Sequence, residues 1–332
     1  MMTFDEFLPV IFMAIMGLAM LTYVILDGYD LGVGMLMARA SKDQKDTMIA
    51  SIGPFWDANE TWLVLGVGLL LIAFPKAHGM VLGALYLPVA FMLIGLILRG
   101  VAFDFRVKAQ DNHKRAWNRA FAAGSAIASV SQGWMLGRYV TGLQDGWLFD
   151  AFAAAIAVAL PAAYALLGAC WLILKTEGEL QERAIGWARK AWPLVVLGIA
   201  AISIATPIVS ATVRERWFQM PEFIALLPIP LTSAIALLGL RGLLNSHRIR
   251  GKLCGLPFAL LVLVFVLGFF GLAYSLYPFV VMDQLTIWQA ASSPAALKVI
   301  LIGVAVAVPA IAAYTVLAYR IFGGKATALR YA

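Results

Sequence analysis

Charged residues are scarce in this chain. Asp, Glu, Lys and Arg make up only 13% of its 332 residues, whereas 62% are apolar. Ordinary globular domains have about a quarter charged residues. The apolar residues come in repeated runs of about twenty, long enough to cross the ~30 Å hydrocarbon core of a bilayer as helices. The composition therefore excludes a soluble domain and predicts an all-α integral membrane protein.

Metal-binding side chains are also few. The three histidines are His78, His113 and His247, and the two cysteines are Cys170 and Cys254. There is no CxxC or CxxCH, which excludes a zinc ribbon and covalent haem attachment. Copper or di-iron chemistry needs His clusters or Glu-x-x-His, and neither occurs. We therefore expect this chain alone to bind no haem or metal, and the cysteines to be buried structural thiols.

Nine apolar runs predict nine transmembrane helices in one membrane domain, 1–332. A secretory signal would need a basic start, but Asp5 and Glu6 stand there without Lys or Arg, so we expect the first run to be retained. The predicted helices are 7–38, 54–74, 79–100, 117–139, 149–174, 191–211, 223–243, 256–277 and 297–321.

The basic residues divide unequally between the two sides of these predicted helices. Of the 25 Lys and Arg, 20 fall in the segments on one side, including Arg330 near the C-terminus, and 5 on the side of the N-terminus. The positive-inside rule therefore predicts the N-terminus outside and the C-terminus in the cytoplasm. The connection 277–294, which has no Lys or Arg, is predicted to be an outer interfacial connector or, alternatively, a short amphipathic lid.

Charges inside a membrane are costly and often mark function. The first run contains LDGYDLGVGMLM, in which Asp27 and Asp30 are three residues apart and so share a helix face. The run is about 46 Å long if it is helical throughout, which puts both acids near the cytoplasmic interface. Gly28 and Gly32 form a small-xxx-small pair that permits close approach of another helix.

The second helix begins on the same side with IGPFWDANETWL. Asp57 and Glu60 are again three apart, and Pro54 suits a helix start. A structural interpretation is a well-capped helix, because acids in a first turn complement the helix dipole. Trp56 and Trp62 would then lie in an aromatic belt. Spacing alone leaves the structural and functional interpretations equally open.

The third helix ends on that side with LRGVAFDFR. Arg99 and Asp104 could be counter-charges, and Arg106 an anchor on the cytoplasmic side. Three consecutive helices thus bring four acids and Arg99 to one depth, and acids in such a group can share a proton. A proton entry from the cytoplasm is one interpretation. The alternative is an interhelical salt bridge between Arg99 and Asp27 or Asp30.

Taken in order, the segments LDGYDLGVGML, IGPFWDANETWL, LRGVAFDFR and LTIWQAASS resemble subunit II of cytochrome bd-type quinol oxidases. The likeness runs essentially from end to end, and four ordered motifs are far more specific than one. YALLGACWLILKTEGELQ and the short chain are most similar to the cyanide-insensitive branch. One departure is Ala58, where the family usually has glycine.

The resemblance implies a role in a copper-free ubiquinol:oxygen oxidoreductase of the bacterial cytoplasmic membrane, which reduces O2 to water. It implies nine helices arranged as two four-helix bundles plus one peripheral helix. The partners implied are a haem-bearing subunit I with haem b and haem d (or a further haem b), a small single-helix accessory subunit, lipid, and a quinone in a hydrophobic cleft. No nucleic acid is expected.

The resemblance also implies roles for single residues. Asp57 would belong to the cytoplasmic proton pathway, with its neighbours Trp56, Asn59, Glu60, Asp27 and Asp30. Two other functions remain open. A stand-alone secondary transporter would place its site near the midplane, where charges are scarce here. A purely structural scaffold would use the acids only to connect helices.

Overall fold

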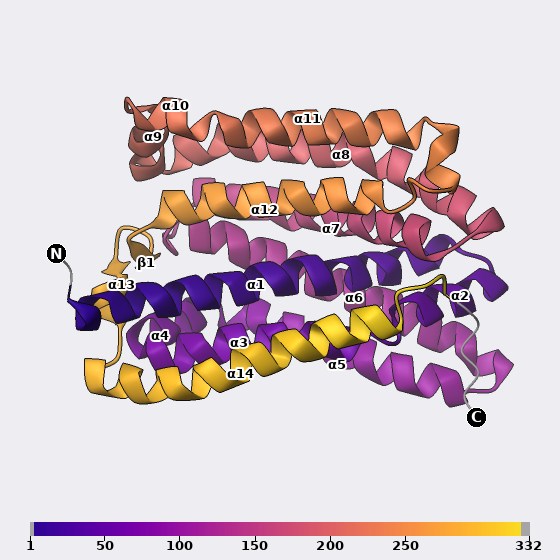
Figure 1. Cartoon of the computed structure of the whole chain (residues 1–332), viewed down its shortest axis with the longest axis horizontal. Helices are drawn as coiled ribbons and strands as arrows, with labels where there is room; N and C mark the ends of the chain where they lie inside the picture. The colour runs from indigo at the N-terminus through magenta and orange to yellow at the C-terminus, as the bar shows by residue number, and fades with distance from the viewer. Residues whose placement is uncertain (1–2, 327–332) are drawn as a thin grey trace.

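The computed structural model describes residues 3–326 and is almost entirely helical within them (Figure 1). Two short 3-10 helices, Met37–Arg39 and His247–Arg250, and two short strands accompany the α-helices. The α-helices are α1 (Phe4–Leu36), α2 (Lys42–Ile52), α3 (Trp56–Ala73), α4 (Pro75–Ala84), α5 (Tyr86–Lys108), α6 (Asp111–Val140), α7 (Trp147–Lys175), α8 (Gly178–Val209), α9 (Ala211–Phe218), α10 (Glu222–Leu226), α11 (Pro228–Leu244), α12 (Leu256–Leu276), α13 (Ile287–Ala290) and α14 (Pro294–Ile321).

Within the described residues, eight helical segments are long and apolar enough to span a membrane, so the chain is a multi-pass membrane protein. They contain α1, α3, α5, α7, α8, α11, α12 and α14. The predicted run 117–139 forms α6, a helix of 30 residues that is more polar than the others. The N-terminal end of α1 and the C-terminal end of α14 lie at opposite ends of the bundle (Figure 1).

Several helix boundaries differ from the predicted ones. The predicted run 79–100 is divided at Leu85 into α4 and α5, and α5 continues to Lys108. The predicted 191–211 begins at Gly178 instead, because the amphipathic stretch GELQERAIGWARK continues the same helix. The segment after α1 forms α2, which begins with a capping box at Ser41 and Gln44.

Helices α5, α6 and α7 are antiparallel neighbours. Gly95 and Gly124 approach each other's helix backbone between α5 and α6, and Gly137 contacts Ala153 between α6 and α7. Helix α1 instead runs parallel to α7. Gly28 faces Tyr164, and one turn further along both helices Gly32 faces Gly168. Helix α6 therefore runs the length of the bundle between α5 and α7.

Glycine determines the spacing between α1 and α7. A Cβ atom at Gly32 would lie 1.8 Å from the Tyr164 carbonyl oxygen, and one at Gly168 would lie 2.5 Å from the Val33 nitrogen. Backbone atoms cannot yield as a flexible side chain can, so only glycine fits at these positions. The close approach predicted for the Gly28–Gly32 pair is confirmed.

The connection 277–294 folds at the end where α1 begins. Strands β1 (Phe279–Val281) and β2 (Leu285–Thr286) pair antiparallel, with Val281 opposite Leu285, and α13 follows. The Trp288 indole nitrogen donates to the Glu6 carbonyl (2.9 Å), and the Ser292 hydroxyl donates to the Ile72 carbonyl (2.7 Å). The connection is thus a folded cap across the first turn of α1 and the last turn of α3.

The other end carries Arg39, Lys175 and Arg320, and we call it the basic end. The segment after α14 returns there to the last turn of α7. Buried Lys175 donates through Nζ to the carbonyls of Phe322 (2.5 Å) and Gly324 (2.7 Å), and Lys325 donates to the Thr176 carbonyl (3.0 Å). We call these three contacts the C-terminal clasp. Arg330, counted above among the basic residues, lies outside the described residues.

Candidate functional site

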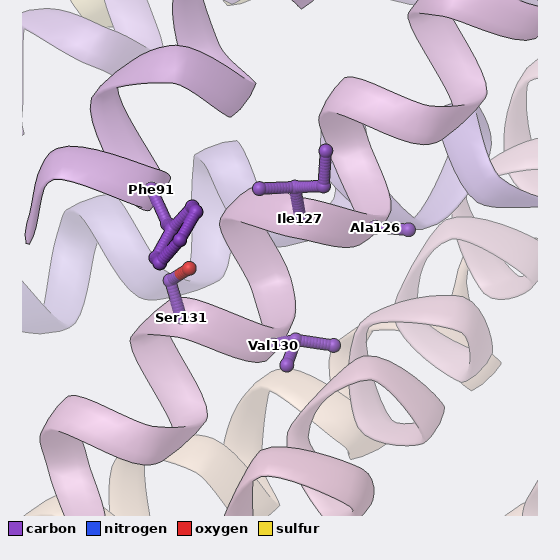
Figure 2. Close-up of a pocket in the computed structure, with 5 residues that line it drawn as sticks. All are labelled: Phe91, Ala126, Ile127, Val130 and Ser131. Carbon is purple, nitrogen blue, oxygen red and sulfur yellow. The ribbon is translucent and has the colours of Figure 1, made fainter. Parts of the chain in front are cut away.

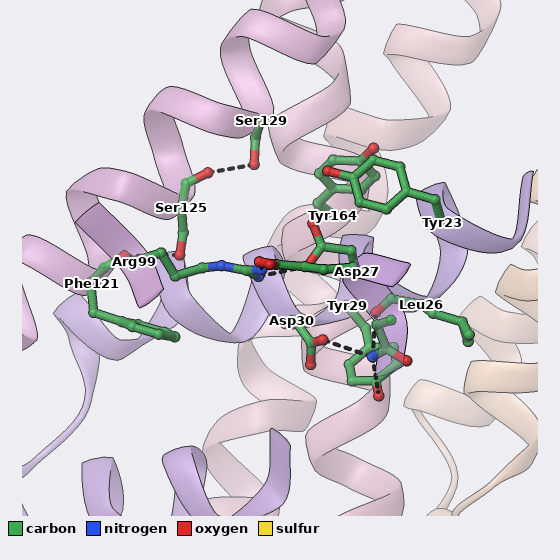
Figure 3. A network of polar contacts seen from close by, with 12 residues as sticks. Tyr23, Leu26, Asp27, Tyr29, Asp30, Arg99, Phe121, Ser125, Ser129 and Tyr164 are labelled. Atoms are coloured by element: carbon green, nitrogen blue, oxygen red, sulfur yellow. Dashed lines mark hydrogen bonds and ion pairs between the residues drawn. The ribbon is translucent and has the colours of Figure 1, made fainter. Parts of the chain in front are cut away.

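A buried ion-pair cluster connects α1, α3 and α5 towards the basic end. The guanidinium of Arg99 on α5 lies 2.6 Å from Asp27 of α1 and also pairs with Glu60 of α3. Arg99 is 1% exposed and Asp27 is fully buried, whereas the Glu60 side chain is 29% exposed. Figure 3 shows Arg99 extending across the helices to Asp27. A charge this deeply buried needs a partner, and each of these three has one.

Asp30 lies one turn after Asp27 and belongs to a second group of contacts. The Asn59 side-chain nitrogen donates to Asp30 Oδ2 (2.8 Å), to the Tyr29 hydroxyl (2.9 Å) and to the Leu26 carbonyl (3.3 Å). Tyr319 of α14 donates to Asn59 Oδ1 (3.1 Å), and its hydroxyl lies 2.5 Å from that of Tyr29. Through Asn59, the acids of α1 are therefore connected to the last long helix.

Two carboxyl oxygens in this region have no protein donor. Among the described residues, none donates a hydrogen bond to Asp27 Oδ2 or Asp30 Oδ1, although both atoms are buried. Buried oxygens of this kind normally take a hydrogen bond from protein, water or their own proton. Among the described residues, Arg99 pairs with Asp27 and Glu60, and Asp30 lies one turn from Asp27. With all three acids ionised, these four residues would carry a net charge of −2.

Polar side chains continue from Asp27 towards the middle of the bundle. Tyr23, one turn before Asp27, accepts a hydrogen bond from the side-chain nitrogen of Gln132 on α6 (2.7 Å). Tyr164 of α7 donates to the side-chain oxygen Oε1 of the same Gln132 (2.8 Å). Figure 3 shows the rings of Tyr23 and Tyr164 beside Asp27. The buried hydroxyls of Ser125 and Ser129 bond to carbonyls within α6.

The structure brings together five of the predicted site residues and separates two. Asp27, Asp30, Asn59, Glu60 and Arg99 meet in the cluster. Asp57 is exposed at the start of α3, one turn before Glu60 and on the same side of the helix. Asp104 is also exposed, contrary to the expectation that it would be a counter-charge in the cluster. Five residues along a helix turn it by about 140° from Arg99, so Asp104 faces away.

Three further residues near this site make contacts with neighbouring helices. Trp56 packs against Phe103 of α5, with ring centroids 5.1 Å apart. Trp62 is buried and donates to the Thr315 hydroxyl of α14 (3.1 Å), so it is not part of an aromatic belt. Arg106 is 4% exposed and lies 2.5 Å from Asp46, so it connects α5 to α2 in addition to any anchoring role.

Five aromatic or amide side chains of the site were not predicted. They are Tyr23, Tyr29, Gln132, Tyr164 and Tyr319. Tyr29 stands between the two acids in the segment DGYD, and Gln132 is an amide in an otherwise small and apolar part of α6, so both positions carried a signal. Tyr319 carried none, because its contact with Asn59 joins residues 260 positions apart.

Two shallow apolar grooves lie on the outside of the bundle. One, of about 340 Å³, lies between α5 and α6 and is lined by Phe91, Ile127 and Ser131 among others (Figure 2). The other, of about 370 Å³, lies between α3 and α14, where Gly68 and Gly303 leave room. Residues 3–326 contain no group of three or more His, Cys, Asp or Glu arranged to hold a metal ion.

Comparison with known proteins identifies the family. The family description "Cytochrome bd terminal oxidase subunit II" matches residues 8–322. Cytochrome bd ubiquinol oxidase subunit 2 of Bacillus subtilis is 29% identical over 90% of this chain and 91% of its own length. Cytochrome bd-I ubiquinol oxidase subunit 2 of Escherichia coli is 27% identical over 96% and 95%.

A solved structure shares the fold. A chain of the bd oxidase from Geobacillus thermodenitrificans superposes with a TM-score of 0.76 at 16% identity, covering 95% of this chain and 98% of that one. With a family match over nearly the whole sequence, two similar relatives of almost full coverage and this common fold, the chain belongs to the cytochrome bd terminal oxidase subunit II family.

Proposed function

We propose that this chain supports a haem-bearing subunit I in a quinol oxidase and supplies part of the proton path from the cytoplasm. Membership of the subunit II family implies a subunit I partner and a place in an oxidoreductase complex. The haems, held by the partner, supply the chemistry that reduces O2 to water. In this proposal, the acids of this chain accept protons and pass them on towards the partner.

The observation that carries this proposal is a gradient of burial through the acidic cluster. Asp57 is exposed, Glu60 is 29% exposed, Arg99 is 1% exposed and Asp27 is fully buried. The four residues lie in that order from the surface of α3 into the core. A proton accepted at Asp57 can pass to Glu60 one turn away, and Arg99 holds Glu60 and Asp27 on either side of one cation.

The direction of this path depends on the membrane topology, for which we propose nine spans with the basic end in the cytoplasm. The parallel arrangement of α1 and α7 supports α6 as the additional span, since the chain must return between α5 and α7. The excess of Lys and Arg at the basic end supports the orientation. Asp57 would then face the cytoplasmic side, from which the protons for water formation are taken.

The arrangement of the histidines supports placing the haems in the partner subunit. His113 and His247 are exposed at helix ends, and His78 lies in the short α4. A haem needs an axial ligand that faces a ring-sized space, and the exposed side chains of His113 and His247 do not face the interior of the bundle. For a quinone or lipid tail we propose the groove between α3 and α14, because its walls are apolar and its volume suits a ligand.

We also propose that the complex belongs to the cyanide-insensitive branch, on the strength of the segment 164–181, YALLGACWLILKTEGELQ. Turnover of the purified complex in graded cyanide tests this proposal separately from the proton path. Retained turnover supports the assignment, and inhibition like that of an ordinary haem–copper oxidase would contradict it.

Asp57→Asn in the whole complex tests the proton path. The variant keeps the shape of the side chain but cannot carry a proton as a carboxyl does, so we expect slow oxygen reduction with the haem spectrum retained. Asp5→Asn is the matched control, because Asp5 is an acid at the opposite end, paired with Lys298 at 2.7 Å. Full turnover of Asp57→Asn would remove Asp57 from the path, and loss of the assembled complex would favour the scaffold function.

A further inference from the structure

Three side chains from three helices form a closed ring of hydrogen bonds at the basic end. Tyr29 belongs to α1, Asn59 to α3 and Tyr319 to α14. The two hydroxyls are 2.5 Å apart, the Tyr319 hydroxyl is 3.1 Å from Asn59 Oδ1, and the Asn59 nitrogen is 2.9 Å from the Tyr29 hydroxyl. The proton-path residues named above include Asn59 but neither tyrosine.

The groups around this ring determine which way the Asn59 amide points, because the ring alone could close in either sense. Each hydroxyl has one hydrogen to donate, and the amide nitrogen has two. If Tyr319 donates to Asn59 Oδ1, then Tyr29 donates to Tyr319 and the Asn59 nitrogen donates to Tyr29. The second amide hydrogen is then directed at Asp30 Oδ2, 2.8 Å away. A flipped amide would place its oxygen against two acceptors, the Asp30 carboxyl and the Leu26 carbonyl. The amide nitrogen therefore faces these acceptors, and Oδ1 faces Tyr319.

Tyr319 is itself held by packing and by the C-terminal clasp. Its ring lies 4.6 Å from that of Phe55, and the Lys175 ammonium lies 5.0 Å from the Phe55 ring centroid. Lys175 in turn holds the carbonyls of Phe322 and Gly324, just beyond the end of α14. The position of the Tyr319 hydroxyl therefore depends on the docking of the last helix and the segment after it.

We propose that Tyr319 is a positioning residue: its hydroxyl donates to Asn59 Oδ1 and holds the amide in place, so that the amide nitrogen donates a hydrogen bond to Asp30. This inference rests on the proposed proton path, in which Asp30 is a neighbour of the Asp57–Glu60–Arg99–Asp27 series. Asp30 has one oxygen with a fixed donor and one without a protein donor among the described residues. Because Asn59 donates to Oδ2, the other oxygen of Asp30, Oδ1, is the one that would take and release a proton.

Tyr319→Phe in the assembled complex tests the proposal, with Tyr314→Phe as the matched control because Tyr314 lies on the same helix and is 50% exposed. The readout is the infrared difference spectrum between oxidised and reduced complex, in which the carboxyl band of Asp30 is assigned by its loss in Asp30→Asn. We expect Tyr319→Phe to shift that band and to slow turnover about fivefold, the factor of one ordinary hydrogen bond. Tyr314→Phe should change neither.

A second variant distinguishes positioning from a general loss of structure. Tyr29→Phe keeps the stacking of this ring on Trp171, at a centroid distance of 4.1 Å, and leaves the donation from Tyr319 to Asn59 in place. We therefore expect a smaller shift of the Asp30 band than in Tyr319→Phe. An unchanged Asp30 band in Tyr319→Phe would overturn the proposal. Full turnover of Asp30→Asn with the Tyr319→Phe band shift still present would instead contradict the role of Asp30 in the proton path and leave the positioning of its carboxyl intact.

Discussion

Replacement of Arg99 is the most severe single change that the site predicts. Arg99→Met removes the cation that pairs with Asp27 and Glu60, and it leaves Asp27 fully buried beside an apolar chain. Breaking a buried ion pair by removing one partner costs about 3–5 kcal/mol. The thermal midpoint of the complex should fall on the order of 5 to 10 °C. The haem spectrum, followed during heating, measures this midpoint.

The double variant Arg99→Met with Asp27→Leu separates the ion pair from simple packing. With both members of the buried pair replaced by apolar side chains, neither member leaves the other's charge without its partner, and Asp30 keeps its hydrogen bond from Asn59. Glu60 can still reach water, because its side chain is 29% exposed. We therefore expect the double variant to recover most of the stability that Arg99→Met loses, although it should not recover turnover.

The surface pair of Arg183 and Glu179 supplies the control. These two side chains are 42% and 76% exposed and lie 3.3 Å apart, one turn from each other on α8. Exposed pairs of this kind contribute little to stability, so Arg183→Met should leave the midpoint nearly unchanged. If Arg99→Met were equally mild, or if the losses of the two single variants simply added in the double variant, the account of the cluster as a buried ion pair would be wrong.

Further predictions concern the bundle and its basic end. Gly32→Ala places a Cβ atom 1.8 Å from the Tyr164 carbonyl oxygen and should lower the thermal midpoint clearly, whereas Gly268→Ala, which has open space, should not. Lys175→Met removes the donor to two carbonyls of the C-terminal clasp, so limited trypsin digestion should cleave after Lys325 sooner than in the unchanged complex. The chain expressed without its partner should show no Soret band, and a strong one would contradict the placement of haem in subunit I.

Sequence was a good guide to the helices because their signals are local. Runs of about twenty apolar residues predict membrane helices directly, and the spacing of Gly28 and Gly32 predicted a close contact without naming the partner. The division at Leu85 and the early start of α8 at Gly178 were missed. Both depend on packing and on amphipathic turns that a count of apolar residues does not record.

The site was predictable in its acids but not in its connections. Asp27, Asp30 and Glu60 stood out because charge is rare in apolar helices. Asp104 was misplaced, since proximity in sequence to Arg99 does not put a residue on the same helix face. Tyr319 could not be found at all, because its role arises from three helices meeting at Asn59. Rare charged residues in apolar helices thus indicate where a buried site lies. The neutral side chains that complete the site follow from tertiary contacts, which the sequence does not show.

We propose that protons reach the partner's haems through the acids of α1 and α3. Their uptake from the inner medium can be followed with a pH indicator after an oxygen pulse to complexes in vesicles. Glu60→Gln keeps an oxygen that can accept from Arg99 but removes the titrating carboxyl. We expect proton uptake and oxygen reduction to slow together by at least about tenfold in this variant. Uptake as fast as in the unchanged complex would show that protons do not pass through Glu60.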